Sequence, residues 1–179
     1  RSVANRGYYY TPHIIKSIKG QPIDKKFTTK HVTTIDHKYF EPVVSGLFDV
    51  YNLGTAHALQ VEGIEICGKT GTAENYTKIN SKRVKLQDHS IFVAFAPKDN
   101  PKIALAVLVE NGYWGARWAG PIASLMIEKY IKKKITRTDL EKRMLEGSLQ
   151  GEYAKYTGRK ETDTLLLKKP TVAEKIGRA

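Results

Sequence analysis

The chain has 179 residues, of which 41% are hydrophobic, and this is enough for one domain of ordinary size with a hydrophobic core. The composition therefore excludes a disordered or fibrous protein. Thirty Lys and Arg residues against eighteen Asp and Glu residues give a net charge of +12, which favours anionic partners in general. Because no aromatic and basic motif of an RNA-binding protein accompanies this charge, we expect no nucleic-acid partner.

Cysteine and histidine usage narrows the chemistry further. The single cysteine, Cys67, excludes an internal disulfide and a cysteine-rich zinc site. The five histidines show no metal-ligand spacing, so we expect neither a metal ion nor a cofactor. No run of about 18 apolar residues occurs, so no segment of this sequence is expected to span a membrane. Residues 1–7 resemble the end of a helix that stops at Asn5-Arg6-Gly7, as if the domain began further upstream.

The first elements expected along the chain are two strands and a helix. Residues 8–18 are rich in aromatic and β-branched side chains and predict a strand that Pro12 interrupts or places at an edge. Residues 27–35, rich in Thr and Val, predict a second short strand. Residues 43–52 predict an amphipathic helix ending near Gly54, because their apolar side chains follow the spacing i, i+3, i+4 and i+7: Val44, Leu47, Phe48 and Tyr51.

The clearest pair of strands lies further along. Residues 90–96 and 103–109 are almost continuously apolar, which predicts strands at the centre of a sheet with both faces covered. The five polar residues between them, 97–101, are enough only for an antiparallel hairpin. A helix should then begin at Ala119, with Pro121 in its first turn.

The composition changes beyond residue 135, where charged and small residues dominate. We therefore expect a domain over residues 1–135 and a basic C-terminal tail over residues 136–179. Residues 138–141, Thr-Asp-Leu-Glu, form a capping-box pattern that predicts a short helix in this tail. One alternative function follows from the tail, namely a non-catalytic binding or scaffold module whose basic tail engages partner proteins or anionic lipid.

Residues 66–74 fit two unrelated functional patterns. From Lys69, Lys-Thr-Gly is the element that serine acyl-transfer enzymes acting on penicillin and cell-wall peptides carry on a strand beside the active site. From Gly63 to Thr70, the same stretch fits the spacing G-x-x-x-x-G-K-[ST] of a nucleotide-binding loop, so a nucleotide hydrolase is the other alternative. A phosphate-binding loop joins a buried parallel strand to a helix, and neither flank has that pattern, which favours the strand interpretation.

The chemistry of the strand interpretation fits each residue. The ammonium of Lys69 would attract the carboxylate of a donor peptide and keep a nearby proton-shuttling group in the useful protonation state. The hydroxyls of Thr70 and Thr72 can hydrogen-bond that carboxylate, the backbone N–H of Thr72 is a candidate oxyanion donor, and Gly71 leaves space for a substrate that lies along the strand. Strict alternation places Lys69 and Thr70 on opposite faces, so both can serve one site only where the strand borders a cleft at its edge.

Several motifs in a fixed order resemble the C-terminal part of the transpeptidase domain of class B penicillin-binding proteins, most closely those of the elongation type. The resemblance covers roughly three quarters of the chain and rests on these segments: Ala4–Gly7, Tyr10–Ile14, Gly68–Glu74, Asp88–Pro97, Val107–Gly112 and the helix opened by Pro121. It implies an α+β fold, in which an antiparallel sheet with flanking helices forms part of a penicillin-binding, serine β-lactamase-like domain. It also implies Lys69 as a catalytic residue and Thr70, Gly71 and Thr72 as substrate-binding residues.

The activity that this resemblance implies is that of a peptidoglycan D,D-transpeptidase. A serine attacks a stem peptide ending in D-Ala-D-Ala, an amine of a neighbouring strand then attacks the acyl-enzyme, and penicillins and other β-lactams acylate the same serine. The implied location is a periplasmic catalytic domain that is held to the inner membrane by an anchor outside this chain.

The sequence departs from this family in one respect. No Ser-x-x-Lys and no Ser-x-Asn occurs in the 179 residues. We therefore expect a fragment that carries the Lys-Thr-Gly wall of the active site, lacks the nucleophile and is inactive alone. Its partner would be the missing N-terminal part of the same domain, and its uncovered apolar surface should favour self-association.

Three further side-chain types near these motifs could be functional or structural. His89, next to Asp88, is expected to be structural, because adjacent residues of a strand point to opposite faces. Cys67 is expected to be a small core residue rather than a reactive thiol. Trp114 and Trp118 lie on a Gly-rich loop and could line a cleft or cover the core.

Overall fold

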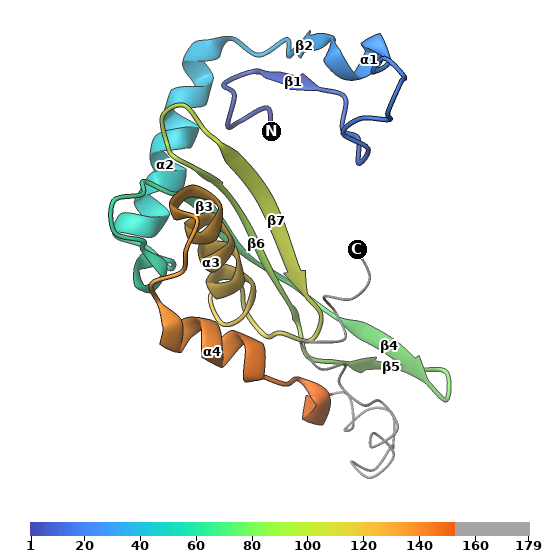
Figure 1. Ribbon diagram of the computed structural model, residues 1–179. Coiled ribbons are helices and arrows are strands. Elements are labelled where there is room, and N and C mark those ends of the chain that lie inside the picture. Colours follow the sequence, from blue (N-terminus) through green and yellow to red (C-terminus); the bar gives the residue numbers. More distant parts are fainter. Residues whose placement is uncertain (153–179) are drawn as a thin grey trace.

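The computed structural model describes residues 1–152, and this part has the expected α+β fold (Figure 1). Its centre is a three-stranded antiparallel sheet in the order β3-β6-β7, formed by Cys67–Ala73, His89–Ala96 and Ile103–Val109. The expected hairpin of residues 90–96 and 103–109 is thereby confirmed as β6 and β7. Within the described residues, β3 and β7 are the two edges of this sheet.

One face of the sheet carries the main hydrophobic core. Helix α3 (Ala119–Lys132) packs on this face against β6 and β7, and it begins where Pro121 predicted it. Helix α2 (Phe40–Asn52) is the expected amphipathic helix and lies beside β3. Fully or almost fully buried side chains from α2, β6, α3 and the segment before β3 meet there, among them Tyr51, Ile66, Phe92, Ala123 and Ile127, and partly buried side chains of β7 pack against them. Burial of this apolar surface is the main stabilising contribution to the fold.

The opposite face of the sheet is largely uncovered, so the expectation of strands buried on both faces is wrong for β7. Its side chains alternate between half-buried and exposed, with Ala104, Ala106 and Leu108 on the exposed side. Val93 of β6 is also exposed there. The physical reason is that, among residues 1–152, the segment of residues 1–4 and helix α2 cover this face at the end near Cys67 and Phe95.

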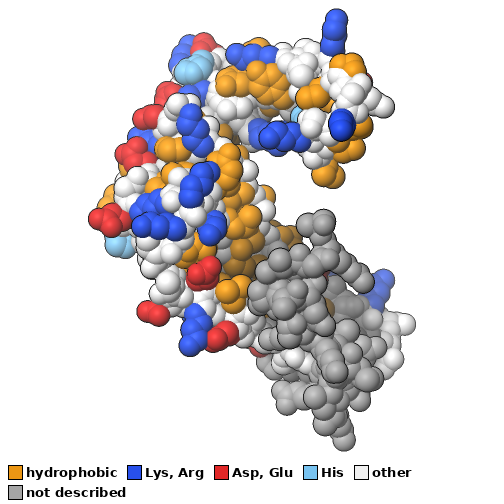
Figure 2. Space-filling model, viewed as in Figure 1, with side chains coloured by type: hydrophobic (Ala, Val, Ile, Leu, Met, Phe, Trp, Pro, Cys, Tyr) orange, Lys and Arg blue, Asp and Glu red, His pale blue; other side chains and the backbone are white. Residues whose placement is uncertain are grey.

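An arm formed by the first part of the chain stands away from the sheet (Figures 1 and 2). It contains the antiparallel pair β1 (Tyr8–Tyr10) and β2 (Lys30–Val32) and the short helix α1 (Lys25–Thr28). Both strands are shorter than the sequence predicted, and the start of the expected second strand is helical. Asp24 explains the helical turn, because its carboxylate caps it by accepting from the N–H of Lys26 at 2.9 Å.

Residues 2–6 form hydrogen-bonded turns at the start of this arm, and these turns close with the pattern expected of a helix end at residues 5–7. The N–H of Gly7 donates to the carbonyl of Ser2 at 2.8 Å and that of Arg6 to the carbonyl of Val3 at 3.0 Å, and Arg6 has a φ of 53°. This is the paired hydrogen-bond pattern that closes many helices. The guanidinium of Arg6 then binds Glu41 at 2.7 Å and Asp99 at 3.0 Å, which ties the segment to α2 and to the β6–β7 turn.

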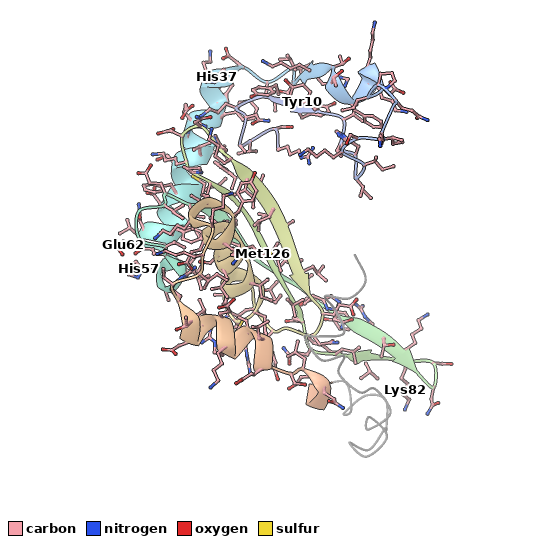
Figure 3. The ribbon with its side chains drawn as sticks, viewed as in Figure 1. Tyr10, His37, His57, Glu62, Lys82 and Met126 are labelled. Atoms are coloured by element: carbon pink, nitrogen blue, oxygen red, sulfur yellow. The ribbon has the colours of Figure 1, made fainter. Side chains whose placement is uncertain are left out.

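A second hairpin lies between β3 and β6, in a polar stretch for which no element was predicted from the sequence. Strands β4 (Tyr76–Ile79) and β5 (Lys82–Lys85) pair in an antiparallel manner. The two residues between them, Asn80 and Ser81, have φ values of 49° and 64°, as a tight two-residue hairpin turn requires. Lys82 near the hairpin tip and Tyr10 in the arm lie at opposite ends of the molecule (Figure 3).

The part of the expected tail that the structure describes is ordered against the domain. Helix α4 (Thr138–Glu146) is the expected short helix, but Arg137 is its N-cap residue and no side chain caps it. Residues 153–179 lie outside the described residues, and the boundary at residue 135 stays a prediction. In residues 1–152, no helix has both the length and the apolar character needed to cross a bilayer.

A buried carboxylate fixes the junction between α3 and α4. Glu128 is fully buried and accepts three hydrogen bonds: from the N–H and hydroxyl of Thr136, at 3.0 and 2.5 Å, and from Nε of Arg137 at 2.9 Å. Burial by itself raises the pKa of Glu128, yet the hydrogen bonds from Thr136 and Arg137 outweigh burial and hold this pKa below its usual value. Arg137 also donates to the carbonyl of Leu59 at 3.3 Å, which anchors the junction to the loop before β3.

Candidate active site

Strand β3 places the Lys-Thr-Gly motif on an edge of the sheet. It pairs with β6 over its whole length, from Cys67 opposite Phe95 to Ala73 opposite His89. Gly68 allows the strand to lie against α2, because a Cβ there would come within 3.0 Å of the Tyr51 ring and 2.9 Å of the Val93 carbonyl. The start of β3 is therefore buried and fixed, while Lys69 and Thr72 are exposed.

Lys69 and Thr70 come together at the open edge of β3 although they belong to opposite faces. The Lys69 ammonium lies 3.0 Å from the carbonyl oxygen of Thr70 and 3.5 Å from its hydroxyl. The lysine side chain thus turns back around the strand edge. This arrangement meets the condition that the sequence analysis set for both residues to serve one site.

The same edge carries backbone groups that can bind a substrate. Because the Thr70 carbonyl points outward to Lys69, alternation along the strand also directs the N–H of Thr72 to the open edge. Gly71, between them, lies against Gly115: a Cβ on Gly115 would be 2.4 Å from the Ile91 carbonyl and 3.0 Å from the Gly71 nitrogen. The loop of residues 113–118 therefore forms a wall directly beside the motif.

A buried serine holds that wall in place. The hydroxyl of Ser90 donates to the carbonyl of Trp114 at 2.9 Å and accepts from the N–H of Ala119 at 3.0 Å. Ser90 lies opposite Thr72 in the register, so it connects the motif strand with the loop and with the start of α3. Sequence reasoning missed this role, because Ser90 alone shows no motif.

A second hydroxyl reaches the motif from the loop after α2. The hydroxyl oxygen of Thr55 lies 3.1 Å from that of Thr70, across 15 positions of sequence. Sequence reasoning also missed Thr55, and its position just after Gly54, at the expected end of the helix, was the only available signal. Three polar side chains, those of Thr55, Lys69 and Thr70, therefore meet at one point of the strand edge.

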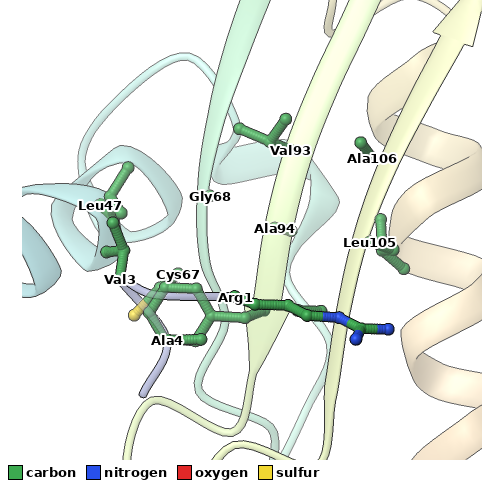
Figure 4. A pocket seen from close by; sticks show the side chains of 12 residues that line it. Arg1, Val3, Ala4, Leu47, Cys67, Gly68, Val93, Ala94, Leu105 and Ala106 are labelled. Atoms are coloured by element: carbon green, nitrogen blue, oxygen red, sulfur yellow. The ribbon is translucent and has the colours of Figure 1, made fainter. Parts of the chain in front are cut away.

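A cavity of about 400 Å³ lies next to the motif, on the face of the sheet to which Lys69 belongs (Figure 4). Its walls come from the first residues of the chain, from Leu47 of α2, and from the sheet, where Gly68 and Val93 lie on neighbouring strands. The lining is mainly apolar. Such a cavity can receive an apolar group that lies beside Lys69.

The residues singled out beside the motif have structural contacts. His89 Nδ1 accepts from the N–H of Asn111 at 3.1 Å, which fits the expected structural role. Cys67 is fully buried, as expected for a core residue, and burial raises the pKa of its thiol to about 11. Trp114 is 54% exposed beside the motif, whereas Trp118 packs on Gly147.

In residues 1–152, no group of three or more His, Cys, Asp or Glu side chains could hold a metal ion.

The structure contradicts the nucleotide-binding alternative. Lys69 and Thr70 lie inside an antiparallel strand, and the next described element after β3 is the β4 strand rather than a helix. Residues 63–66, which would form the phosphate-binding loop, lead directly into β3, and Ile66 is buried in the core. Within residues 1–152, no helix therefore begins directly after the motif, as a phosphate-binding loop requires.

The fold and this motif strand together are those of part of a transpeptidase domain. Residues 1–128 match the family described as the penicillin binding protein transpeptidase domain, and the chain belongs to this family. The expected likeness to class B penicillin-binding proteins of the penicillin-binding protein 2 type is confirmed by relatives at about 30% identity.

Two curated relatives show the extent of the likeness. The peptidoglycan D,D-transpeptidase MrdA of Haemophilus influenzae is 29% identical over 150 residues, which is 76% of this chain and 23% of the relative. The peptidoglycan D,D-transpeptidase PbpA of Mycobacterium tuberculosis is 32% identical over 136 residues, 71% of this chain and 26% of the relative. The chain thus spans about a quarter of the length of these relatives.

Solved structures agree with the fold. Penicillin-binding protein A of M. tuberculosis, as an imipenem acyl-enzyme complex, matches with a TM-score of 0.57 at 29% identity. The match covers 73% of this chain and 28% of the penicillin-binding protein A chain. Pseudomonas aeruginosa PBP2 in complex with WCK 5153 has a TM-score of 0.56 at 29% identity and covers 76% of this chain and 29% of its own.

Proposed function

We propose that this chain supplies the Lys-Thr-Gly wall of a serine D,D-transpeptidase site that cross-links peptidoglycan stem peptides and takes β-lactams in the same place. The observation that carries the proposal is the meeting of the Lys69 ammonium, the Thr70 hydroxyl and the outward backbone of β3 at one open edge. The printed names of the relatives and the acyl-enzyme complex of a structural neighbour support it.

Each residue of the wall has a role in this proposal. A peptide that lies along the open edge of β3 extends the sheet by one strand, and Gly71 leaves room for its side chain. The Lys69 ammonium attracts the terminal carboxylate, and Thr70 and Thr72 hydrogen-bond it. The N–H of Thr72 faces the carbonyl oxygen of the acyl donor, where negative charge develops during attack.

The nucleophile of the reaction is proposed to come from the N-terminal part of the same domain. None of the seven serines of this chain has a lysine three positions later, and the buried Ser90 is engaged with Trp114 and Ala119. In this arrangement Lys69 acts as a catalytic residue by keeping a proton-shuttling group of that missing part in its reactive protonation state. The chain alone therefore binds but does not acylate. The completed domain is proposed to act on the periplasmic side of the inner membrane.

Two measurements on the 179-residue chain test this proposal. Incubation with a fluorescent penicillin should give no covalent band, and a stoichiometric, heat-stable adduct would show that the chain contains its own nucleophile. Titration with a peptide ending in D-Ala-D-Ala should shift the NMR amide signals of residues 69–72.

A matched pair of variants makes the titration specific. Lys69→Met should abolish these shifts, because it removes the charge that attracts the carboxylate while keeping an unbranched apolar side chain. Lys78→Met, on the β4–β5 hairpin, removes the same charge outside the motif strand and should leave the titration unchanged. Equal shifts in both variants would contradict a carboxylate site at Lys69.

A further inference from the structure

In the proposed site, the hydroxyl of Thr70 has to point at the open edge of β3 to reach a substrate carboxylate. A threonine side chain is restricted at χ1, and its staggered rotamers aim the hydroxyl in different directions. The observed rotamer aims it at the open edge, 3.5 Å from the Lys69 ammonium and 3.1 Å from the Thr55 hydroxyl oxygen. In this rotamer, the Thr70 hydroxyl contacts Thr55, a residue that lies outside the motif strand.

The loop that carries Thr55 is held firmly on both sides of it. The N–H of Ala56 donates to the carbonyl of Val50 at 3.1 Å, and the N–H of His57 donates to the carbonyl of Gly54 at 3.1 Å. Ala56 is fully buried, and Gly54 lies so close to α2 that a Cβ would be 3.0 Å from the Val50 Cα. Thr55 is thus a fixed point provided by α2 rather than by β3.

Hydrogen-bond capacity then decides what Thr55 does. A threonine hydroxyl donates one hydrogen bond and accepts two. In Thr70, the Lys69 ammonium approaches one acceptor position at 3.5 Å, and the 3.1 Å contact with Thr55 allows either hydroxyl to be the donor. With Thr55 as the donor, both acceptor positions of Thr70 are used, and the proton of Thr70 is free to be donated to an incoming carboxylate at the open edge.

We propose that Thr55 is a positioning residue for the substrate carboxylate: it donates to Thr70 and so presents the Thr70 proton to the carboxylate. This inference rests on the proposed function, because it needs an acyl donor with a free carboxylate at the edge of β3. It adds to the site a residue from a different element that the Lys-Thr-Gly pattern does not contain.

The first test needs no ligand. Three-bond NMR couplings from the Thr70 methyl carbon to its backbone nitrogen and carbonyl carbon report the χ1 rotamer. The wild-type chain and Thr55→Ser should show one dominant rotamer, whereas Thr55→Val, which has the same shape without a hydroxyl, should show averaging. Unchanged couplings in Thr55→Val would overturn the positioning role whatever the chain binds.

The second test separates this inference from the proposed function. Two peptides ending in D-Ala-D-Ala are titrated, one with a free carboxylate and one with a terminal amide. We expect Thr55→Val to bind the carboxylate peptide about three- to tenfold more weakly than wild type, Thr55→Ser to stay within about twofold, and the amide peptide to bind both variants and wild type alike.

Each outcome of this titration has one meaning. If the wild-type chain does not prefer the carboxylate peptide, the carboxylate site of the proposed function is wrong and the role of Thr55 falls with it. If the wild type prefers the carboxylate peptide but Thr55→Val binds it equally well, only the role of Thr55 is overturned. A loss in Thr55→Val that is equal for both peptides would indicate a general distortion and would also overturn it.

Discussion

The buried carboxylate of Glu128 lies 2.9 Å from the guanidinium nitrogen Nε of Arg137, and this pair ties helix α3 to the segment that enters α4. Because Arg137 also donates to carbonyl groups of Leu59 and Gln60, the pair fixes the loop before β3 as well. We therefore expect this ion pair to stabilise the loop that leads into the motif strand. The pKa of the Glu128 carboxylate is lower than usual, so the contribution of this pair to stability should change with pH and can be measured.

Replacing Glu128 with Gln should destabilise the chain by about 2 kcal/mol at pH 7, because Arg137 loses its charged partner inside the protein. The pKa of Glu128 is lowered in the folded state, so its stabilising effect is complete above the unfolded value near 4.5 and is lost as the pH falls through the folded value. Urea unfolding at several pH values should show a difference between wild type and Glu128→Gln that shrinks below about pH 4.5. Glu146→Gln, at an exposed position of α4, is the control and should leave stability nearly unchanged; a pH-independent difference for Glu128→Gln would contradict the linkage.

Replacing Gly115 with Ala should loosen the wall beside the motif. The new Cβ would lie 2.4 Å from the Ile91 carbonyl, so the loop of residues 113–118 must move away from β3 and β6. We expect a loss of about 1–3 kcal/mol in urea unfolding and a shift of the Gly71 amide signal. Gly46→Ala is the matched control, because Gly46 lies in α2 with nothing within 4 Å of the added Cβ, and it should stabilise the chain by about 0.5–1 kcal/mol. Equal stability of both variants would show that the loop is not packed on Gly71.

The thiol of Cys67 should report unfolding of the motif strand. It is fully buried, it contacts the carbonyl of Val44 at 3.6 Å, and its pKa is raised to about 11, so almost no thiolate is present at pH 8. A thiol reagent such as DTNB should therefore react with the native chain much more slowly than with the chain in 6 M urea. Fast reaction of the native chain at pH 8 would show that the start of β3 is open to solvent.

The helices and the central hairpin could be predicted from the sequence because their signals are local. The spacing of Val44, Leu47, Phe48 and Tyr51 defines α2, and Pro121 marks the start of α3. The β4–β5 hairpin was missed because the stretch between Glu74 and Asp88 is polar, although Asn80-Ser81 between Thr- and Val-containing segments was an available turn signal. The burial of only one face of β7 could not be predicted, since the sequence of an apolar strand does not show which of its faces another element will pack against.

Some residues of the site could be predicted from the sequence, and others could not. Lys69, Thr70, Gly71 and Thr72 could be selected from sequence because the motif is contiguous. Thr55 could not be selected, because its contact with Thr70 depends on how α2 ends beside β3, and this is a tertiary relationship. The roles of the four motif residues remain proposals until they are tested with substrate.

The uncovered face of the sheet leads to a prediction about association. Val93 is 44% and Leu108 58% exposed, and they lie on neighbouring strands next to the open edge of β7. An exposed apolar face beside an open strand edge favours pairing with another copy, so the isolated chain should form dimers or larger species at micromolar concentration in analytical ultracentrifugation. The double variant Val93→Lys, Leu108→Lys should be monomeric, because it places charges on this face. Leu53→Lys is the control: Leu53 is 87% exposed at the end of α2, away from this face, and its replacement should leave the association unchanged. A monomeric wild-type chain, or equal association of all three proteins, would exclude this face as the contact.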